Sequence, residues 1–429
     1  MNNQNHNVID NLPTGWEITK LGDVCDTTSG GTPSRKQPEY YGGNIPWIKS
    51  GELDKGVIFD SEEKITNEAI KNSSAKVFPK GTLLIALYGA TIGKLAYLGI
   101  DAATNQAICG IFKNDKIDQR YLYNYLFFKR RDLINQGIGG AQPNISQGIL
   151  KNLYIPLPPP DEQSNIVEKI EELFSELDKG IENLKIAQQQ LKVYRQAVLK
   201  WAFEGKLTNE NVKDGELPEG WEWVKLRDVC DKIQDGSHFS PQVQYDEPGE
   251  NRFMYITAKN IRNNYMDFRK LYYVDKDYHE SIYGRCNPEY GDVLLTKDGI
   301  NTGEVTLNTL KEPFSLLSSV CLFKPKKQIL RAELLKYFIQ SPFGNKVILQ
   351  SMTGTAIKRI ILGKIKEAKI SLPSLKEQSE IILEIESRLS VCDKMEETIN
   401  NSLQQAEALR QSILKRAFEG KLVRNYESV

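Results

Sequence analysis

LPTGWEITKLGDVCD at residues 12–26 returns as LPEGWEWVKLRDVCD at residues 217–231, 205 residues further along the chain. A second pair follows, because RQAVLKWAFEGKL at 195–207 returns as RQSILKRAFEGKL at 410–422, now at an offset of 215. Internal repeats of this kind fix the architecture before any single element is considered. The chain therefore consists of two copies of one unit of roughly 200 residues.

The middle parts of the two copies share only a few positions. GTLLIALYGATIGKLAYL at 81–98 aligns with GDVLLTKDGINTGEVTLN at 291–308, and three glycines coincide while the side chains between them differ. We interpret this as a constant scaffold that carries two different ligand-reading surfaces, and drift after duplication is the alternative. The glycine-bounded segments 89–94 and 299–304 are expected to be hairpin turns. They are not phosphate-binding loops, because Leu95 stands where Ser or Thr would hold magnesium.

Composition limits the class of protein. The 429 residues are 40% hydrophobic and 26% charged, which predicts two or three globular domains. Lys plus Arg and Asp plus Glu both number 56, and this balance neither supports nor excludes a nucleic-acid partner. The six cysteines form no CxxC pair, so buried free thiols are expected and structural zinc is not. No signal peptide or membrane span is recognised, and the protein is expected to be cytoplasmic.

Each copy ends in a long, proline-free segment with apolar residues at alternating steps of four and three. Such spacing predicts coiled-coil helices. Prolines precede both segments, in LPPPDEQSNI at 157–166 and LPSLKEQSEI at 372–381, and Gly205 and Gly420 follow them. We expect the two helices to pair antiparallel and to separate two reading domains. The alternative is that each helix packs on its own domain.

At this point the motifs resemble a known family, the specificity subunits of type I restriction-modification enzymes. The residues that carry the resemblance are GWE near Gly15, GGTP at 30–33, PWIK at 46–49, QPNIS at 142–146 and the AFEGKL helix ends. The second copy departs from the pattern, with DGSH at 235–238 in place of GGTP and IKRII at 357–361 in place of QPNIS.

The resemblance implies a non-catalytic, sequence-specific DNA-binding subunit of α+β fold, with two mixed α/β target-recognition domains that each read one half of a split target. It also implies that two methyltransferase subunits dock on the helices and that restriction subunits join through them. S-adenosylmethionine, ATP and magnesium would then lie on partner subunits, with no cofactor on this chain. The expected boundaries are 1–156 and 208–371 for the recognition domains and 157–207 and 372–429 for the helical regions.

Side chains that read DNA are expected in loops flanked by glycine or proline. Base edges are contacted by Arg, Lys, Asn, Gln, Ser and Thr, and phosphates mainly by Lys and Arg. In the first copy the candidates are Thr32, Ser34, Arg35, Lys36, Lys49, Ser50, Tyr88, Thr91, Lys94, Gln142 and Asn144. In the second copy they are Ser237, His238, Lys259, Asn260, Arg262, Lys297, Asp298, Asn301, Lys358 and Arg359. Trp16 and Trp221 occur in both copies, so we expect them to be core residues.

The repeated helix ends suggest two equivalent docking surfaces. Phe203, Lys206, Phe418 and Lys421 are the candidate partner-binding residues, and closure of the helix pair within the chain is the alternative. No catalytic or metal-binding residue is predicted, because NPEY at 287–290 lacks the second proline of an adenine methyltransferase motif. A methyltransferase or nuclease with an unrecognised site, and a purely structural dimerisation protein, remain the competing hypotheses. The half-site centres are expected about one helical turn, or roughly 10 base pairs, apart.

Overall fold

The computed structural model describes residues 12–54, 56–137, 144–209, 211–213, 215–349, 352–353 and 359–423. The chain divides into two compact units. Unit 1 comprises Met1–Leu184 with Asn401–Val429, and unit 2 comprises Lys185–Asn400. The two long helices are therefore each shared by both units, so the division falls differently from the expected boundaries, which made the helices separate regions.

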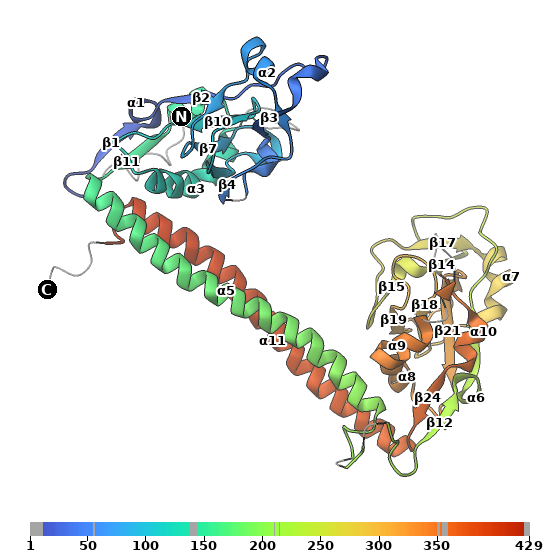
Figure 1. Cartoon of the computed structure of the whole chain (residues 1–429). Coiled ribbons are helices and arrows are strands. Elements are labelled where there is room, and N and C mark those ends of the chain that lie inside the picture. Colours follow the sequence, from blue (N-terminus) through green and yellow to red (C-terminus); the bar gives the residue numbers. More distant parts are fainter. Residues whose placement is uncertain are drawn as a thin grey trace. The chain divides into compact units, whose positions relative to one another are not determined.

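Unit 1 is built on two main sheets and a short ribbon (Figure 1). The first sheet has the order β2 (Thr27–Ser29), β10 (Ile108–Ile111), β7 (Leu83–Ala86), β8 (Leu95–Leu98), β4 (Gly56–Ile58). The second has the order β5 (Lys64–Ile65), β3 (Tyr41–Ile48), β9 (Ala102–Thr104), β6 (Val77–Phe78). The ribbon pairs β1 (Glu17–Lys20) with β11 (Tyr154–Leu157). The helices outside the long pair are α1 (Leu21–Val24), α2 (Asn67–Asn72), α3 (Gln119–Gln136) and α4 (Gln147–Lys151).

Unit 2 repeats this plan with different loops (Figure 1). Its main sheets have the orders β13 (Cys230–Asp235), β21 (Val320–Pro325), β18 (Val293–Thr296), β19 (Val305–Leu307), and β17 (Tyr272–Asp275), β14 (Arg252–Ile256), β20 (Ser315–Leu316). Short ribbons pair β12 (Glu222–Lys225) with β24 (Lys369–Leu372), β15 (Ile261–Arg262) with β16 (Tyr265–Met266), and β22 (Met352–Thr353) with β23 (Arg359–Ile360). The shorter helices are α6 (Leu226–Val229), α7 (Lys276–Cys286), α8 (Ala332–Gln340), α9 (Pro342–Leu349) and α10 (Leu362–Glu367).

The shared glycines have a conformational cause. Gly89 and Gly93 in the β7–β8 turn have φ of +62° and +71°, and their counterparts Gly299 and Gly303 in the β18–β19 turn have +104° and +98°. Only glycine enters this region of backbone space without strain. Both turns join antiparallel strands, so the prediction of hairpin turns is confirmed.

The long helices are α5 (Pro160–Phe203) and α11 (Leu375–Phe418). As predicted, the prolines mark their starts, since α5 begins at Pro160 and α11 begins two residues after Pro373, and both helices end before the glycines. Matching ion pairs link them in each unit. Arg195 contacts Asp393 at 2.7 Å in unit 2, and Arg410 pairs with Asp178 in unit 1. From the first of these contacts on α5 to the second, the residue number rises from 178 to 195, while the partner's number on α11 falls from 410 to 393. The two helices are therefore antiparallel.

The apolar residues at steps of four and three form a stripe along each long helix, in which Glu396 and Arg410 are the charged members in α11 and Gly180 is the break in α5. Glu396, one of the two charged residues in the stripe of α11, lies 3.0 Å from Arg195. Arg410, the other, packs its guanidinium over the Phe174 ring at 4.6 Å. Gly180 is exposed, and the half-buried Ile181 takes its place in the stripe.

A buried glutamine fastens the start of each long helix to its recognition fold. In unit 1, Gln163 accepts from the backbone N–H of Asp118 at 2.7 Å and donates to Pro158 O at 2.9 Å. In unit 2, Gln378 accepts from the N–H of Arg331 at 2.9 Å and donates to Pro373 O at 3.0 Å. Both side chains are essentially fully buried. The repeated EQS sequence is therefore explained by contacts within each unit.

The C-terminal ends of the two long helices also make equivalent contacts in the two units. Gly420 has φ of +69°, and a Cβ there would lie 2.2 Å from Pro13 Cγ; Gly205 has φ of +75°, and a Cβ would lie 2.1 Å from Pro218 Cγ. Each AFEGKL end thus packs against an LPxGW segment. In unit 1 these two segments come from opposite ends of the chain.

Phe203 and Phe418 contradict their predicted role as partner anchors. Phe418 is 2% exposed, and its ring centroid lies 5.3 Å from that of Tyr121 and 4.9 Å from that of Tyr125 on α3. Phe203 is also buried and packs on Phe338 of α8 at 5.3 Å. Both rings join a long helix to the recognition fold of their own unit, which is close to the alternative of closure within the chain.

All six cysteines are buried, and the prediction of buried free thiols is confirmed. Burial raises the pKa of the Cys109 thiol to about 11 and that of Cys286 to about 12. Trp16 and Trp221 are both 8% exposed and lie in the cores, as predicted. Within the described residues, no helix is long and apolar enough to cross a membrane.

Candidate nucleic-acid interface

In unit 1 the candidate loops meet where the strands of the two sheets end. The N–H of Gly31 donates to Thr104 O at 3.0 Å, and the N–H of Asn105 donates to Ile48 O at 2.9 Å. The loop after Ala86 joins them, because the N–H of Leu87 donates to Ala107 O at 2.8 Å. Segments far apart in sequence therefore form one edge, which we call the reading edge of unit 1: residues 30–36, 49–54, 87–94, 104–107 and 144–146.

Three of the four charged candidates on this edge, Arg35, Lys49 and Lys94, are held by carboxylates. Arg35 forms a bidentate pair with Glu63 and lies over the Tyr41 ring, 4.2 Å from its centroid. Lys49 Nζ lies 3.1 Å from Glu62. Lys94 Nζ lies 2.9 Å from Asp54.

Arg35 remains 58% exposed in its side chain and so stays accessible. Its pairing with Glu63 lowers the pKa of that carboxyl and raises that of the guanidinium. The guanidinium of Arg35 is thus held in one orientation, which favours a contact of defined geometry with a ligand at this edge.

The remaining candidates of unit 1 carry polar side chains, and two of these side chains bond to the backbone of their own loop. Thr91 donates to Tyr88 O at 2.8 Å, and Ser34 Oγ accepts from the N–H of Lys36 at 3.3 Å. Tyr88 forms an isolated bridge with Asn144, and both are exposed. Thr32 and Ser50 are half-buried. Gln142 lies outside the described residues.

Unit 2 forms the same kind of edge from residues 235–239, 256–262, 297–304 and 316–319. The N–H of Ser318 donates to Ser237 O at 2.9 Å, and the N–H of Lys297 donates to Ser319 O at 2.7 Å. A bulge between Cys230 and Lys232 shifts the register of β13 by one residue. In unit 1, Ser29 pairs with Cys109, and in unit 2, Asp235 pairs with Cys321. Because of the shifted register, Asp235 is therefore the counterpart of Ser29.

A buried carboxylate organises this second edge. Asp235 is 3% exposed and accepts from Lys297 Nζ at 2.8 Å, from Arg285 at 2.7 Å and from His238 Nε2 at 3.1 Å. Burial alone would raise the pKa of Asp235, but the hydrogen bonds from Lys297 and Arg285 outweigh it and leave the pKa below its usual value. At the matching positions unit 1 has Ser29 and Leu87, so the two edges differ even in their buried parts.

Two candidates of unit 2 are structural and were wrongly assigned to DNA contacts. Asn260 is fully buried, accepts from the N–H of Thr257 at 3.0 Å and donates to Asp267 O at 2.9 Å. Glu52 closes the corresponding turn in unit 1 in the same way, through the N–H of Lys49. Lys297 is 7% exposed and is held in the pair with Asp235.

The other candidates of unit 2 lie on or near the edge. Lys259 Nζ lies over the Tyr272 ring at 5.8 Å, and Arg262 lies 3.7 Å from Glu304. His238 is 57% exposed in its side chain, whereas Ser237 is buried. Asp298 and Asn301 flank the tip of the β18–β19 turn. Lys358 lies outside the described residues, and Arg359 is described only as part of β23.

The sequence reasoning missed two apolar side chains on this edge. Ile300, at the turn tip, is 100% exposed, and Phe239 is 79% exposed. A search confined to polar and charged residues passes over both. The sequence signal that could have identified these two side chains was their position next to glycine and polar residues of the loops.

The lysines of the repeated helix ends form local ion pairs. Lys206 Nζ lies 3.0 Å from Glu204, and Lys421 Nζ lies 2.8 Å from Glu419. Lys421 is 63% exposed in its side chain and Lys206 is 25% exposed. They remain candidates for partner contacts, whereas Phe203 and Phe418 do not.

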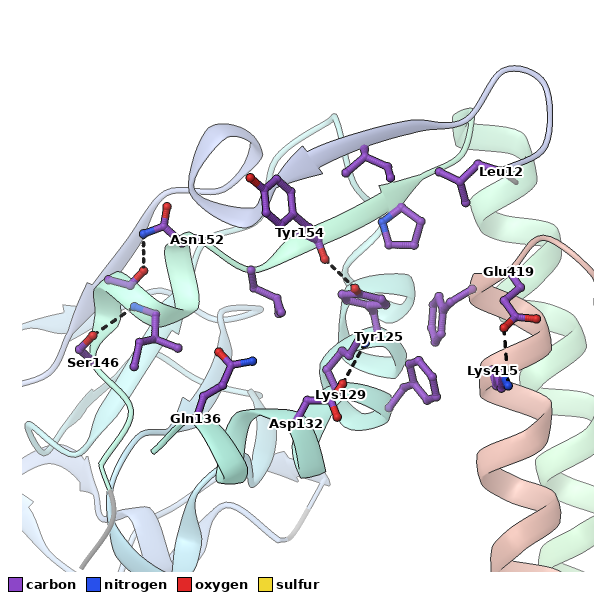
Figure 2. Close-up of a pocket in the computed structure, with 17 residues that line it drawn as sticks. Leu12, Tyr125, Lys129, Asp132, Gln136, Ser146, Asn152, Tyr154, Lys415 and Glu419 are labelled. Carbon is purple, nitrogen blue, oxygen red and sulfur yellow. Dashed lines mark hydrogen bonds and ion pairs between the residues drawn. The ribbon is translucent and has the colours of Figure 1, made fainter. Parts of the chain in front are cut away.

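A groove of about 510 Å³ lies in unit 1 between α3, α4, β11 and the end of α11 (Figure 2). Leu12, Tyr125 and Tyr154 line it, and Tyr125 donates to Tyr154 O at 2.6 Å. In unit 2 Trp223 stands where β1 carries Ile18, and Phe343 of α9 packs on it at 5.3 Å. The corresponding ribbon of unit 2 therefore contacts α9 through a pair of aromatic rings.

Comparisons with known proteins agree on one family. A family model described as the type I restriction modification DNA specificity domain matches residues 13–186 and again residues 218–405. The type I restriction enzyme MjaIX specificity subunit of Methanocaldococcus jannaschii is 29% identical over 380 residues, which cover 85% of this chain and 84% of that protein. The EcoBI specificity subunit of Escherichia coli is 27% identical over 450 residues, which cover 99% and 90%.

Solved structures share the fold. A chain from work on complex assembly and conformational transition of the type I R-M system has a TM-score of 0.74 at 20% identity, covering 96% of this chain and 99% of that one. The HsdS subunit from Thermoanaerobacter tengcongensis has a TM-score of 0.58 at 21% identity, covering 96% and 98%.

The family model matches both copies of the duplicated mixed α/β fold, and this places the chain in the class of DNA specificity proteins. The chain belongs to the family of type I restriction-modification specificity subunits.

Proposed function

We propose that the chain reads a bipartite DNA target, with one half-site bound by the reading edge of each unit. The observation that carries this is the contrast between the two edges. Both are built on the same glycine turns and the same convergence of loops, yet Asp235 and Lys297 of unit 2 replace Ser29 and Leu87 of unit 1. A shared frame with different groups is suited to reading two different sequences, because base contacts depend on side-chain chemistry.

The test is a domain exchange. Residues 12–156 would be replaced by the corresponding residues of another family member, and the complex with its methyltransferase would be used to map the methylated motif. We expect one half of the motif to change and the other half to persist. A change in both halves, or in neither, would contradict one half-site per unit.

We further propose that two methyltransferase subunits dock on the chain, in the cytoplasm, and supply the S-adenosylmethionine site, while restriction subunits with ATP and magnesium join through them. Lys206 and Lys421 lie at equivalent helix ends, with side chains 25% and 63% exposed, and this supports two equivalent surfaces. Light scattering with methyltransferase in excess should give a mass with two methyltransferases per chain. Saturation at one per chain would rule out two equivalent sites.

A further inference from the structure

The tip of the β18–β19 turn presents an aliphatic side chain entirely to solvent. Ile300 is 100% exposed, and Gly299 before it has φ of +104° with open space around it. Single exposed apolar residues are ordinary on protein surfaces and prove nothing by themselves. This one lies on the reading edge of unit 2, and its backbone is firmly held.

Four contacts fix the turn that carries Ile300. Lys297 at its start is anchored by Asp235 at 2.8 Å and by Ser319 O at 2.7 Å. The N–H of Gly303 at its end donates to Thr296 O at 2.9 Å, and Thr302 Oγ1 donates to Gly299 O at 2.6 Å. A side chain on a closed and anchored turn projects in a defined direction.

A second apolar side chain projects from the neighbouring loop. Phe239 is 79% exposed, and its carbonyl accepts from Ser237 Oγ at 3.1 Å and from Tyr278 OH at 2.5 Å. Ser237 O is bonded to Ser318, the residue before the Ser319 that anchors the other loop. The two exposed side chains therefore rise from adjacent points of the edge.

The matching positions of unit 1 carry different groups. The counterpart of Ile300 is Ala90, because Leu87 and Lys297 make the same backbone bond in their respective turns. The counterpart of Phe239, after the one-residue shift in β13, is the buried Pro33. At these two positions, a large apolar side chain projects from the second edge and not from the first.

We propose that Ile300, flanked by Phe239, contacts the C5-methyl group of a thymine in the major groove, so that the second half-site requires an A·T pair at that position. Among base edges in the major groove the thymine methyl is the apolar feature, and aliphatic and aromatic side chains are its natural partners. This inference rests on the proposed function, since it assigns a base contact to one of the two reading edges.

The test uses the full chain in complex with its methyltransferase and duplexes that carry the target found by motif mapping. Each thymine of the second half-site is replaced in turn by uracil, which removes only the methyl group. At one position we expect uracil to weaken binding about 3- to 10-fold for the wild type, as loss of one buried methyl implies. For Ile300→Ala the same replacement should have no effect.

The matched control is Leu383→Ala, which removes an aliphatic side chain that is 66% exposed on α11 of unit 2, away from the reading edge. It should keep the wild-type response to uracil. Uracil tolerated at every position by the wild type, or a second half-site without thymine, would overturn the inference while leaving bipartite reading intact. Loss of methyltransferase binding by Ile300→Ala with an unchanged uracil response would also overturn it, by making the tip a protein contact. A complex with no sequence-selective binding at all would instead refute the proposed function.

Discussion

Phe418 lies edge-on against Tyr121 and Tyr125 and closes the core of unit 1. Truncation to alanine leaves a cavity that the surrounding aromatic rings cannot fill. We expect Phe418→Ala to lower the free energy of unfolding by about 3–5 kcal/mol, measured by urea denaturation. Phe203→Ala should do the same in unit 2.

Val193→Ala is the control for these variants, because Val193 is 71% exposed on α5. It should change stability by less than about 0.5 kcal/mol. A Phe418→Ala protein of wild-type stability that fails to bind methyltransferase would instead support the interpretation of this residue as a partner anchor.

Asp235 makes the stability of unit 2 depend on pH. Its pKa in the folded protein lies below the ordinary value, so the carboxylate stabilises the fold above the pKa of the unfolded chain, which is about 3.9. This contribution disappears as pH falls through the lower, folded pKa. Asp235→Asn should therefore cost about 2 kcal/mol at pH 7, and the difference from wild type should shrink below about pH 4.

Unfolding free energies at several pH values would show this convergence. Asp231→Asn, an exposed neighbour on the same strand, is the control and should cost little at any pH. A stability difference for Asp235→Asn that stays constant from pH 7 to pH 3 would contradict the role assigned to the charge.

Replacing glycine by alanine should have opposite effects on stability within a long helix and just after its end. Gly180 lies in α5, and a Cβ added there would meet no atom within 4 Å, whereas Gly205 and Gly420 end their helices at positive φ against proline rings. Gly180→Ala should raise stability by about 0.5–1 kcal/mol, because glycine is a poor helix former. Gly205→Ala and Gly420→Ala should each lower it, since the alanine Cβ meets Pro218 or Pro13. Thermal unfolding of the three variants distinguishes the two effects, and stabilisation by Gly420→Ala would contradict the proposed closure.

The repeat, the two long helices and the hairpin turns were predictable, because glycine, proline and heptad spacing are local signals. The role of the helix ends was not. Near-identity of AFEGKL in both copies suggested a partner, but Gly420 meets Pro13 from the other end of the chain, and no local pattern reveals such a contact. The buried roles of Asn260 and Lys297 were likewise hidden, since a polar residue in a glycine-rich loop can cap its own backbone.

At the scale of the whole molecule, both long helices run without a break through the two units, and each has 44 residues. An insertion of four residues after Ala187 in α5 alone would shift α5 against α11. The ion pairs Arg195–Asp393 and Arg410–Asp178 could then not both form. We therefore propose that the spacer of the DNA target is set by the two helices together, and that any change of length must be made in both.

Seven residues inserted after Ala187 and seven after Asn400 would preserve the heptad phase and the contact of Gln188 with Asn400 at 3.2 Å. Each helix would lengthen by about 10 Å, which corresponds to roughly three base pairs at 3.4 Å per pair. Methylation mapping should then find a longer unspecified spacer between unchanged half-sites. The insertion in α5 alone should lower the unfolding free energy instead. A spacer of the original length in a stable, doubly lengthened protein would mean that the helices do not set the distance between the half-sites.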